Sequence, residues 1–212
     1  MQLIHAADLH LDSSFGALPE EKARRRRQES REVLERLERL AQQTQAEAVL
    51  LSGDLFDGKK IYRETEEALL RCLSWIRARV FIAPGNHDPY QEGSPYARLE
   101  WPENVHIFRS ASMESVDCGT FVVHGAAFLQ ENSPALLKGF SAPEDGKIHL
   151  MVLHGDVENK ESPYDPITRQ EIAASGLSYL ALGHIHQFSG IQTAGKTAYA
   201  YPGCPEGRGF DE

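Results

Sequence analysis

The stretch Ala48-Val49-Leu50-Leu51-Ser52-Gly53-Asp54 decides the fold, because a short apolar run there stops abruptly at small residues and a carboxylate. A short apolar run bounded by turn residues is typical of a strand that is buried on both faces. The runs Leu3–Ala7, before Asp8, and Val80–Ala83, before Pro84, are built in the same way. The sequence therefore predicts a core of buried strands with polar side chains at their carboxyl ends.

Helical patterns separate these strands. One helix is expected from Pro19, because apolar residues recur at helical spacing as far as Leu40 and Ala41. A second helix is expected over Glu66–Ile76, and residues 89–104 have the composition of a loop. Later strands are expected at Val105–Phe108, Thr120–His124, Ile148–Leu153, Tyr179–Leu182 and Thr197–Tyr201, with a short helix near Ile167–Ser175. The pattern predicts an α/β sandwich of two mixed β-sheets flanked by helices, in one domain over residues 1–212.

Metal-binding residue types directly follow five of the expected strands. A single histidine after a strand is more often structural, but motifs that share one kind of position favour a common site, since ligands bind at the carboxyl ends of strands in α/β sheets. The residues in question are Asp8 and His10, then Asp54, then Asn86 with His87 and Asp88, then His154, and finally His184 with His186.

The donor types indicate the chemistry. Carboxylates, imidazoles and an amide oxygen without thiolates suit Mn²⁺, Fe²⁺ or Zn²⁺. Seven such groups are too many for one ion with open positions, and they fit two ions that share a bridging carboxylate. Such a pair lowers the pKa of a bridging water and holds the oxygens of a phosphoryl group during in-line attack. The predicted reaction is therefore phosphoester hydrolysis.

Composition narrows the class of protein. With 22 basic and 31 acidic side chains the net charge is −9, so a broad basic face for nucleic acid is not expected, and positive charge near a phosphate must come from a local source such as a metal centre. An apolar content of 41% without any membrane-length apolar run predicts a globular protein without a membrane span. Three cysteines without paired spacing, and a first segment unlike a secretory signal, predict a cytoplasmic location.

The order of these motifs, from Asp8 to His186, resembles the calcineurin-like metallophosphoesterase superfamily. Within it, three stretches are most similar to the bacterial SbcD-like DNA repair exonucleases: residues 5–11, residues 53–57 and Tyr201-Pro202-Gly203. The resemblance implies two divalent ions, with manganese first and iron or zinc as alternatives. It assigns one ion to Asp8, His10 and His186, the other to Asn86, His154 and His184, and Asp54 as the bridge.

The same resemblance places His87 near the scissile phosphate as a proton donor or transition-state stabiliser, and Asp88 as a residue that orients its loop or has a purely structural role. It implies a nuclease that uses a metal-bridging hydroxide, with DNA as substrate, an SMC-like ATPase as a possible partner and possible homodimers. The alternative is another calcineurin-like phosphodiesterase, acting on a small nucleotide or cyclic nucleotide. A protein phosphatase is disfavoured, because Gly58-Lys59 follows Asp57 where phosphatases have Arg-Gly.

Two features depart from that pattern. Some relatives carry a histidine three residues after the bridging aspartate, where this chain has Asp57. Full-length relatives also continue into a DNA-capping domain and an ATPase-binding segment, whereas this sequence ends at Gly209-Phe210-Asp211-Glu212. We therefore expect a catalytic domain without those segments, either a truncated piece or a minimal member.

Other residues have simpler interpretations. Residues 24–27 are four consecutive arginines, which would fan around a helix and form a solvated flank. His5, His106, His124 and His149 are interpreted as structural or incidental, and Cys204 as a residue near the site without a nucleophilic role. Tyr96 and Trp101, in the expected loop, are candidates either for stacking on bases or for a dimer contact.

Overall fold

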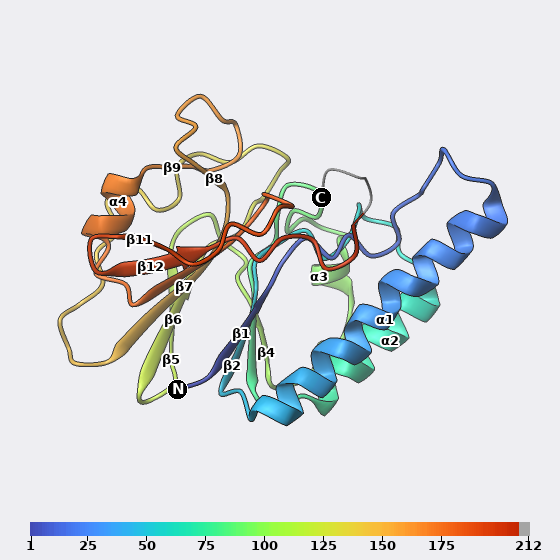
Figure 1. The fold of residues 1–212 in the computed structure, drawn as a ribbon, viewed down its shortest axis with the longest axis horizontal. Helices are drawn as coiled ribbons and strands as arrows, with labels where there is room; N and C mark the ends of the chain where they lie inside the picture. The colour runs from blue at the N-terminus through green and yellow to red at the C-terminus, as the bar shows by residue number, and fades with distance from the viewer. Residues whose placement is uncertain (208–212) are drawn as a thin grey trace.

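Two β-sheets lie face to face in this computed structural model, which describes residues 1–207 (Figure 1). The long helices α1 (Glu20–Thr44) and α2 (Arg63–Trp75) cover the outer face of one sheet, and the short helix α4 (Arg169–Ala174) lies over the other. The final residues of the domain expected over 1–212, including Gly209–Glu212, lie outside the described residues. Within the described part, no helix has both the length and the apolar character needed to cross a bilayer.

The first sheet contains four parallel strands in chain order. Residues of β2 alternate between its two faces: Val49 and Leu51 pack toward α1 and α2, whereas Ala48 and Leu50 pack toward the second sheet. This double burial explains why the strand is a continuous apolar run. The strands are β1 (Leu3–Ala6), β2 (Ala48–Leu51), β3 (Arg79–Ile82) and β4 (Val105–Ile107).

The second sheet has six strands in the order β11-β12-β10-β7-β6-β5. Its four central strands are parallel and its two edge strands are antiparallel to their neighbours, so this sheet is mixed. The strands are β5 (Glu114–Asp117), β6 (Phe121–Gly125), β7 (Ile148–His154), β10 (Tyr179–Gly183), β11 (Gln192–Ala194) and β12 (Thr197–Ala200). Three small elements complete the fold, namely α3 (Pro95–Arg98), β8 (Asp156–Val157) and β9 (Pro166–Ile167).

The expected sandwich of sheets flanked by helices is confirmed, and the differences are local. Strands β5, β8, β9 and β11 were not anticipated, because they are two to four residues long and lack an apolar run. Helix α2 begins at Arg63, earlier than the expected Glu66. Leu40 was expected on the apolar face of α1, but it is 46% exposed because the apolar stripe ends on Leu37 and Ala41.

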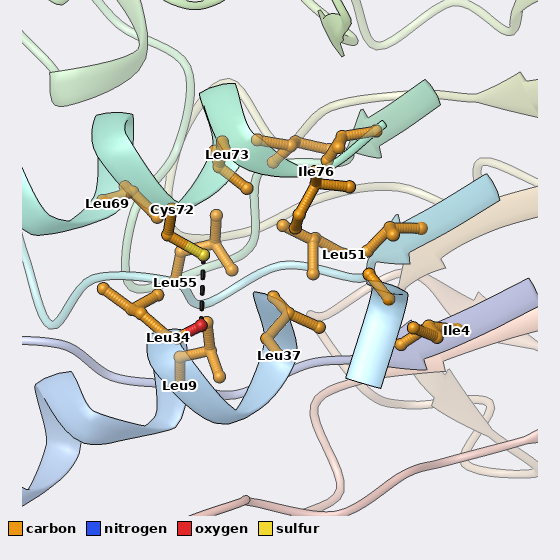
Figure 2. Close-up of a cluster of buried hydrophobic side chains, with 14 of the residues drawn as sticks. Ile4, Leu9, Leu34, Leu37, Leu51, Leu55, Leu69, Cys72, Leu73 and Ile76 are labelled. Atoms are coloured by element: carbon orange, nitrogen blue, oxygen red, sulfur yellow. Dashed lines mark hydrogen bonds between the residues drawn. The ribbon is translucent and has the colours of Figure 1, made fainter. Parts of the chain in front are cut away.

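The interface between α1 and α2 forms the outer core of the first sheet (Figure 2). Leu34 and Leu37 of α1 face Leu69 and Leu73 of α2, and all four side chains are at most 6% exposed. The thiol of Cys72 donates a hydrogen bond of 3.1 Å to the carbonyl of Leu34, where helix α1 meets helix α2. Packing against α1 and α2 holds the strands of the first sheet in place, and the polar motifs lie in the loops that follow those strands.

Replacing Leu34 with alanine is expected to lower the free energy of unfolding by about 2–5 kcal/mol, because it leaves a cavity between the two helices and the sheet. The matched control is Leu40→Ala, which removes the same atoms from an exposed position of the same helix and should change stability by less than about 0.5 kcal/mol. Urea unfolding followed by circular dichroism measures both. Equal losses would contradict the packing described here.

Candidate metal centre

The candidate site lies between the two sheets, where the carboxyl ends of their parallel strands come together. Within the first sheet, the backbone N–H of Asp8 donates to the carbonyl of Gly53 at 3.1 Å, so the loops after β1 and β2 run side by side. Across the sheets, the backbone N–H of His184 donates to both carboxylate oxygens of Asp8 at 3.1 Å. The loops that follow β1, β2, β3, β7 and β10 therefore converge, and they bring together the seven predicted metal ligands and His87.

One group of donors comprises Asp8, His10 and His186, whose ligand atoms lie within 4.8 Å of one another. The Nε2 atoms of His10 and His186 are 3.0 Å apart. Ligand atoms that share an ion at about 2.0–2.2 Å are separated by distances of this size. Residues nearly 180 positions apart in the chain thus form a compact donor group.

A second group surrounds the side-chain oxygen of Asn86. This oxygen lies 2.8 Å from Nε2 of His154 and 3.3 Å from Nδ1 of His184. Asp54 lies between the two groups: its Oδ2 is 3.4 Å from Nε2 of His154 and 3.9 Å from Nε2 of His10. The arrangement has the form expected for two cations that share one carboxylate.

Burial sets the charges of these groups. Asp8 and His154 are fully buried and Asp54 is 2% exposed. Desolvation raises the pKa of Asp54, and it lowers the pKa of His154 and of His184 to about 4 each. The imidazoles are therefore neutral at pH 7, which is the form that binds metals, and the buried carboxylate is a group that an adjacent cation would stabilise. The donor set fits a pair of divalent ions.

The backbone at the site adopts uncommon conformations. Asp8, His10, Asp54 and His184 have positive φ angles of 54°, 42°, 52° and 105°. Non-glycine residues adopt this region at a cost, and such strain persists only where the surroundings enforce it. A Cβ atom at Gly53 would overlap the ring of His154, so glycine is required next to Asp54 by a close approach between the two sheets.

Asp88 holds two of the loops together. Its carboxylate accepts hydrogen bonds from the backbone N–H groups of Gly85, Asp54 and Phe56, at 2.8, 3.2 and 3.0 Å. The hydroxyl of Tyr96 donates to the same carboxylate at 2.6 Å. Burial raises the pKa of Asp88 to about 6, and the four donors offset part of that effect. Of the two roles considered for Asp88, the contacts support the orientation of its loop.

The interpretation of Tyr96 is corrected by these contacts, whereas both interpretations of the partly exposed Trp101 stay predictions. Tyr96 is 2% exposed, and its ring packs against Phe56 and stacks on Trp101 at a centroid distance of 5.8 Å. A buried ring that positions Asp88 is not available for stacking on a base or for a dimer contact. No pattern in the sequence indicated this burial, because the surrounding stretch is rich in turn residues.

His87 differs from the other site residues in its exposure. Its side chain is 44% exposed, and its Nδ1 lies 2.9 Å from Oδ1 of Asp57. Asp57 also lies 3.5 Å from Nδ1 of His10 and accepts a 3.0 Å hydrogen bond from the hydroxyl of Ser13. Hydrogen bonds from His10 and His87 hold the pKa of Asp57 well below its usual range. Asp57 is thus part of the site, and its signal was the second aspartate three residues after Asp54.

The remaining candidates lie around the site or away from it. His5 joins the sheets behind it, within hydrogen-bond distance of the Tyr179 hydroxyl at 2.9 Å and the Leu182 carbonyl at 3.1 Å. The thiol of Cys204 donates to the carbonyl of Asp8 at 3.1 Å. Arg27 is 6% exposed and pairs with Glu20, so this arginine, unlike the expected solvated flank, is buried.

Asp165 is a buried carboxyl that supports the loop after His154. It is fully buried beside Gly155, its Oδ1 accepts a 2.6 Å hydrogen bond from the Leu136 N–H, and among residues 1–207 its Oδ2 has no hydrogen-bond partner. Burial raises the pKa of Asp165 to about 7, whereas an unfolded aspartate titrates near 4. Between these values the folded chain retains a proton that the unfolded chain has lost.

This group should therefore lower the stability of the metal-free protein as the pH rises from about 4 to about 7. We expect Asp165→Asn, which keeps the acceptor for Leu136, to remove that part of the pH dependence, as measured by urea unfolding in EDTA at several pH values. Asp117→Asn is the control, because the pKa of the exposed Asp117 is lowered by Lys147 and shifts stability in the opposite direction. An Asp165→Asn protein that keeps the wild-type slope would contradict the shift.

Comparison with known proteins gives a consistent result. The profile of the family described as calcineurin-like phosphoesterase matches residues 1–188. A crystal structure of TT1561 of Thermus thermophilus superposes with a TM-score of 0.54 at 17% identity, over 82% of this chain and 84% of that one. At that identity the likeness shows the fold alone.

Three curated relatives match most of the chain. It is 33% identical to the uncharacterized metallophosphoesterase YhaO of Bacillus subtilis, over 100% of this chain and 55% of that protein. It is 23% identical to the SbcD component of the nuclease SbcCD of the same species, over 100% and 63%. It is 28% identical to the DNA double-strand break repair protein Mre11 of Aeropyrum pernix, over 95% and 53%. The chain thus spans 53–63% of the length of these relatives.

Proposed function

The chain belongs to the calcineurin-like phosphoesterase family of hydrolases, and we propose that it is a binuclear metal-dependent phosphodiesterase that acts on DNA as an SbcD-type nuclease. The observation that carries this proposal is the pair of donor groups on either side of Asp54, at 3.4 Å from His154 and 3.9 Å from His10. Relatives named as a nuclease component and as a DNA break repair protein support the choice of DNA.

In this proposal Asp54 would be a ligand of both cations. Asp8, His10 and His186 would hold one ion, and Asn86, His154 and His184 would hold the other. Nitrogen and oxygen donors suit manganese, with iron or zinc as alternatives. Such a pair of cations, when bound, lowers the pKa of a water molecule and neutralises the oxygens of a phosphoryl group. The binding of the scissile phosphate here would also explain how an acidic chain accepts an anionic substrate.

His87 is the proton donor in this proposal. Its Nδ1 donates to the Asp57 carboxylate, which fixes the ring and leaves Nε2 as the atom that faces a substrate. Nε2 then gives a proton to the leaving oxygen, or a hydrogen bond to the phosphoryl oxygens as their charge grows. Asp57 acts through His87, since it holds that ring in one orientation and stabilises its charged form.

The proposal of a DNA nuclease also implies a cellular location, a partner protein and an oligomeric state. We propose a cytoplasmic enzyme whose single catalytic domain works with an SMC-like ATPase and forms homodimers. The partner and the dimer rest on the resemblance of the motifs to SbcD-like exonucleases, and the location rests on the three cysteines without paired spacing and on the first segment.

Removing divalent metals should abolish phosphodiester hydrolysis, because every donor at the centre is arranged for a cation. Hydrolysis of bis-p-nitrophenyl phosphate in EDTA, followed by addition of Mn²⁺, measures the loss and its recovery. A panel with Mn²⁺ should then favour linear DNA over cyclic dinucleotides and aryl phosphomonoesters. Activity that is indifferent to EDTA would exclude the mechanism, and a preference for cyclic dinucleotides would replace DNA by a small nucleotide.

His87→Ala should lower kcat on bis-p-nitrophenyl phosphate by about 10²–10⁴-fold while leaving the bound metal unchanged. Asp57→Asn should lower kcat by a smaller factor and alter the pH profile of kcat, since the amide no longer holds the charged ring. His106→Ala is the matched control, because it removes a part-exposed histidine of β4 far from the donors. Metal analysis alongside the kinetics separates the roles, and loss of metal in the His87 variant would contradict the role of proton donor, since His87 also lies within metal-sharing distance of His10 and Asp54.

A further inference from the structure

A second cluster of reactive side chains lies on the second sheet, apart from the metal centre. Ser115 Oγ lies 2.7 Å from Nδ1 of His124, His124 Nε2 lies 2.9 Å from Nδ1 of His149, and His149 Nε2 lies 2.9 Å from Oδ1 of Asp145. The four groups form one continuous hydrogen-bonded chain. The sequence interpretation of His124 and His149 as structural or incidental did not anticipate it.

The pairing of strands β5, β6 and β7 brings Ser115, His124 and His149 next to one another. Ser115 of β5 stands directly opposite His124 of the antiparallel strand β6, so both side chains leave the same face of the sheet. His149 belongs to the adjacent strand β7 and stacks on His124 with ring centroids 5.2 Å apart and an interplanar angle of 16°. The ring of Phe140 covers His124 at 4.8 Å. His124 and His149 are 3% and 4% exposed, whereas Ser115 is exposed to solvent.

The carboxylate at one end determines where every proton lies. Hydrogen bonds from the Lys147 N–H and from His149 lower the pKa of Asp145, so this side chain is ionised and only accepts. Burial lowers the pKa of His124 to about 4, so its ring is neutral. In the tautomer in which each ring donates from Nε2, His149 donates to Asp145, and His124 donates to Nδ1 of His149. Nδ1 of His124 then has a lone pair that accepts the hydroxyl proton of Ser115.

The order of these groups resembles that of a catalytic triad, in which a serine nucleophile is followed by a histidine base and an acid that orients the base. Here a second imidazole, that of His149, lies between the base and the acid. We propose that Ser115 is a covalent modification site for acyl and phosphonyl electrophiles, with His124 as its base and with His149 and Asp145 holding that base. The site is independent of the metal centre, because it lies on the outer face of the sheet and uses none of the metal donors.

The reaction with a fluorophosphonate is balanced by groups that the chain itself supplies. Ser115 Oγ forms the bond to phosphorus, the phosphorus–fluorine bond breaks, and fluoride leaves with its electron pair. The hydroxyl proton passes to Nδ1 of His124 and then to solvent. The charge that appears on the His124–His149 pair is stabilised by the Asp145 carboxylate at the end of the chain.

The test is fluorophosphonate labelling of the whole chain in EDTA, with rates for individual serines from peptide mass spectrometry. Ser112 is an internal reference, because it is exposed in the same segment and has no hydrogen bond to a histidine among the contacts of the described residues. We expect Ser115 to be labelled at least about 100-fold faster than Ser112. Equal labelling of the two serines would overturn the proposal.

A matched pair of variants tests whether the hydrogen bonds from Ser115 to Asp145 activate the serine. Asp145→Asn removes the group that fixes the proton order and should slow labelling of Ser115 at least about tenfold. Asp117→Asn removes the same charge from the strand that carries Ser115, where it pairs with Lys147 and has no hydrogen bond to any of the four groups, and should change the rate less than about twofold. Thermal unfolding confirms that both variants are folded. Equal effects of the two substitutions would mean that charge alone matters, and would contradict the assignment.

Discussion

The carboxylate of Asp54 is almost entirely buried between the two sheets. The rest of the site depends on the groups that stabilise this buried charge. Asp54 is 2% exposed, and desolvation raises its pKa. A buried anion is stable only with compensating partners. Its partners within the chain are the N–H of His87 and the rings of His10 and His154, which leave the carboxylate suited to cations on two sides. Burial likewise keeps the imidazoles of His154 and His184 neutral at pH 7.

Positioning Asp54 requires the loops of both sheets to approach closely. Asp88 supplies the connection within the first sheet, since one carboxylate accepts the backbone N–H groups of Asp54, Phe56 and Gly85. Asp8 supplies the connection between the sheets by accepting the N–H of His184. These bonds hold residues with positive φ in place, so the chain's own hydrogen bonds support the positions of the donors. The fold and the chemistry are therefore coupled through backbone hydrogen bonds.

Much of this arrangement could be predicted from the sequence. Continuous apolar runs such as Ala48–Leu51 predicted strands buried on both faces, and the polar residues after them predicted one site at the sheet edge. The antiparallel edge strands β5 and β11 of the second sheet were missed, because a segment such as Glu114–Asp117 is stabilised by one neighbour and carries no apolar run. The burial of Tyr96 was missed because it depends on a hydrogen bond to Asp88 that only tertiary packing creates. The role of each donor toward a particular cation remains a prediction.

Asp57 and His124 show that the position of a residue in the sequence does not by itself give its role. Asp57 was interpreted as a departure from a related pattern, yet its carboxylate joins His87 to His10. His124 was expected at the end of a strand, as the site residues are, yet it lies within β6 and faces Ser115 on the outer face of the second sheet. Anomalous X-ray diffraction from crystals grown with Mn²⁺ shows directly whether Asp54 joins two cations. We expect two peaks about 3.5–4 Å apart, with Asp54 in contact with both. A single peak, or peaks that Asp54 does not touch, would contradict it.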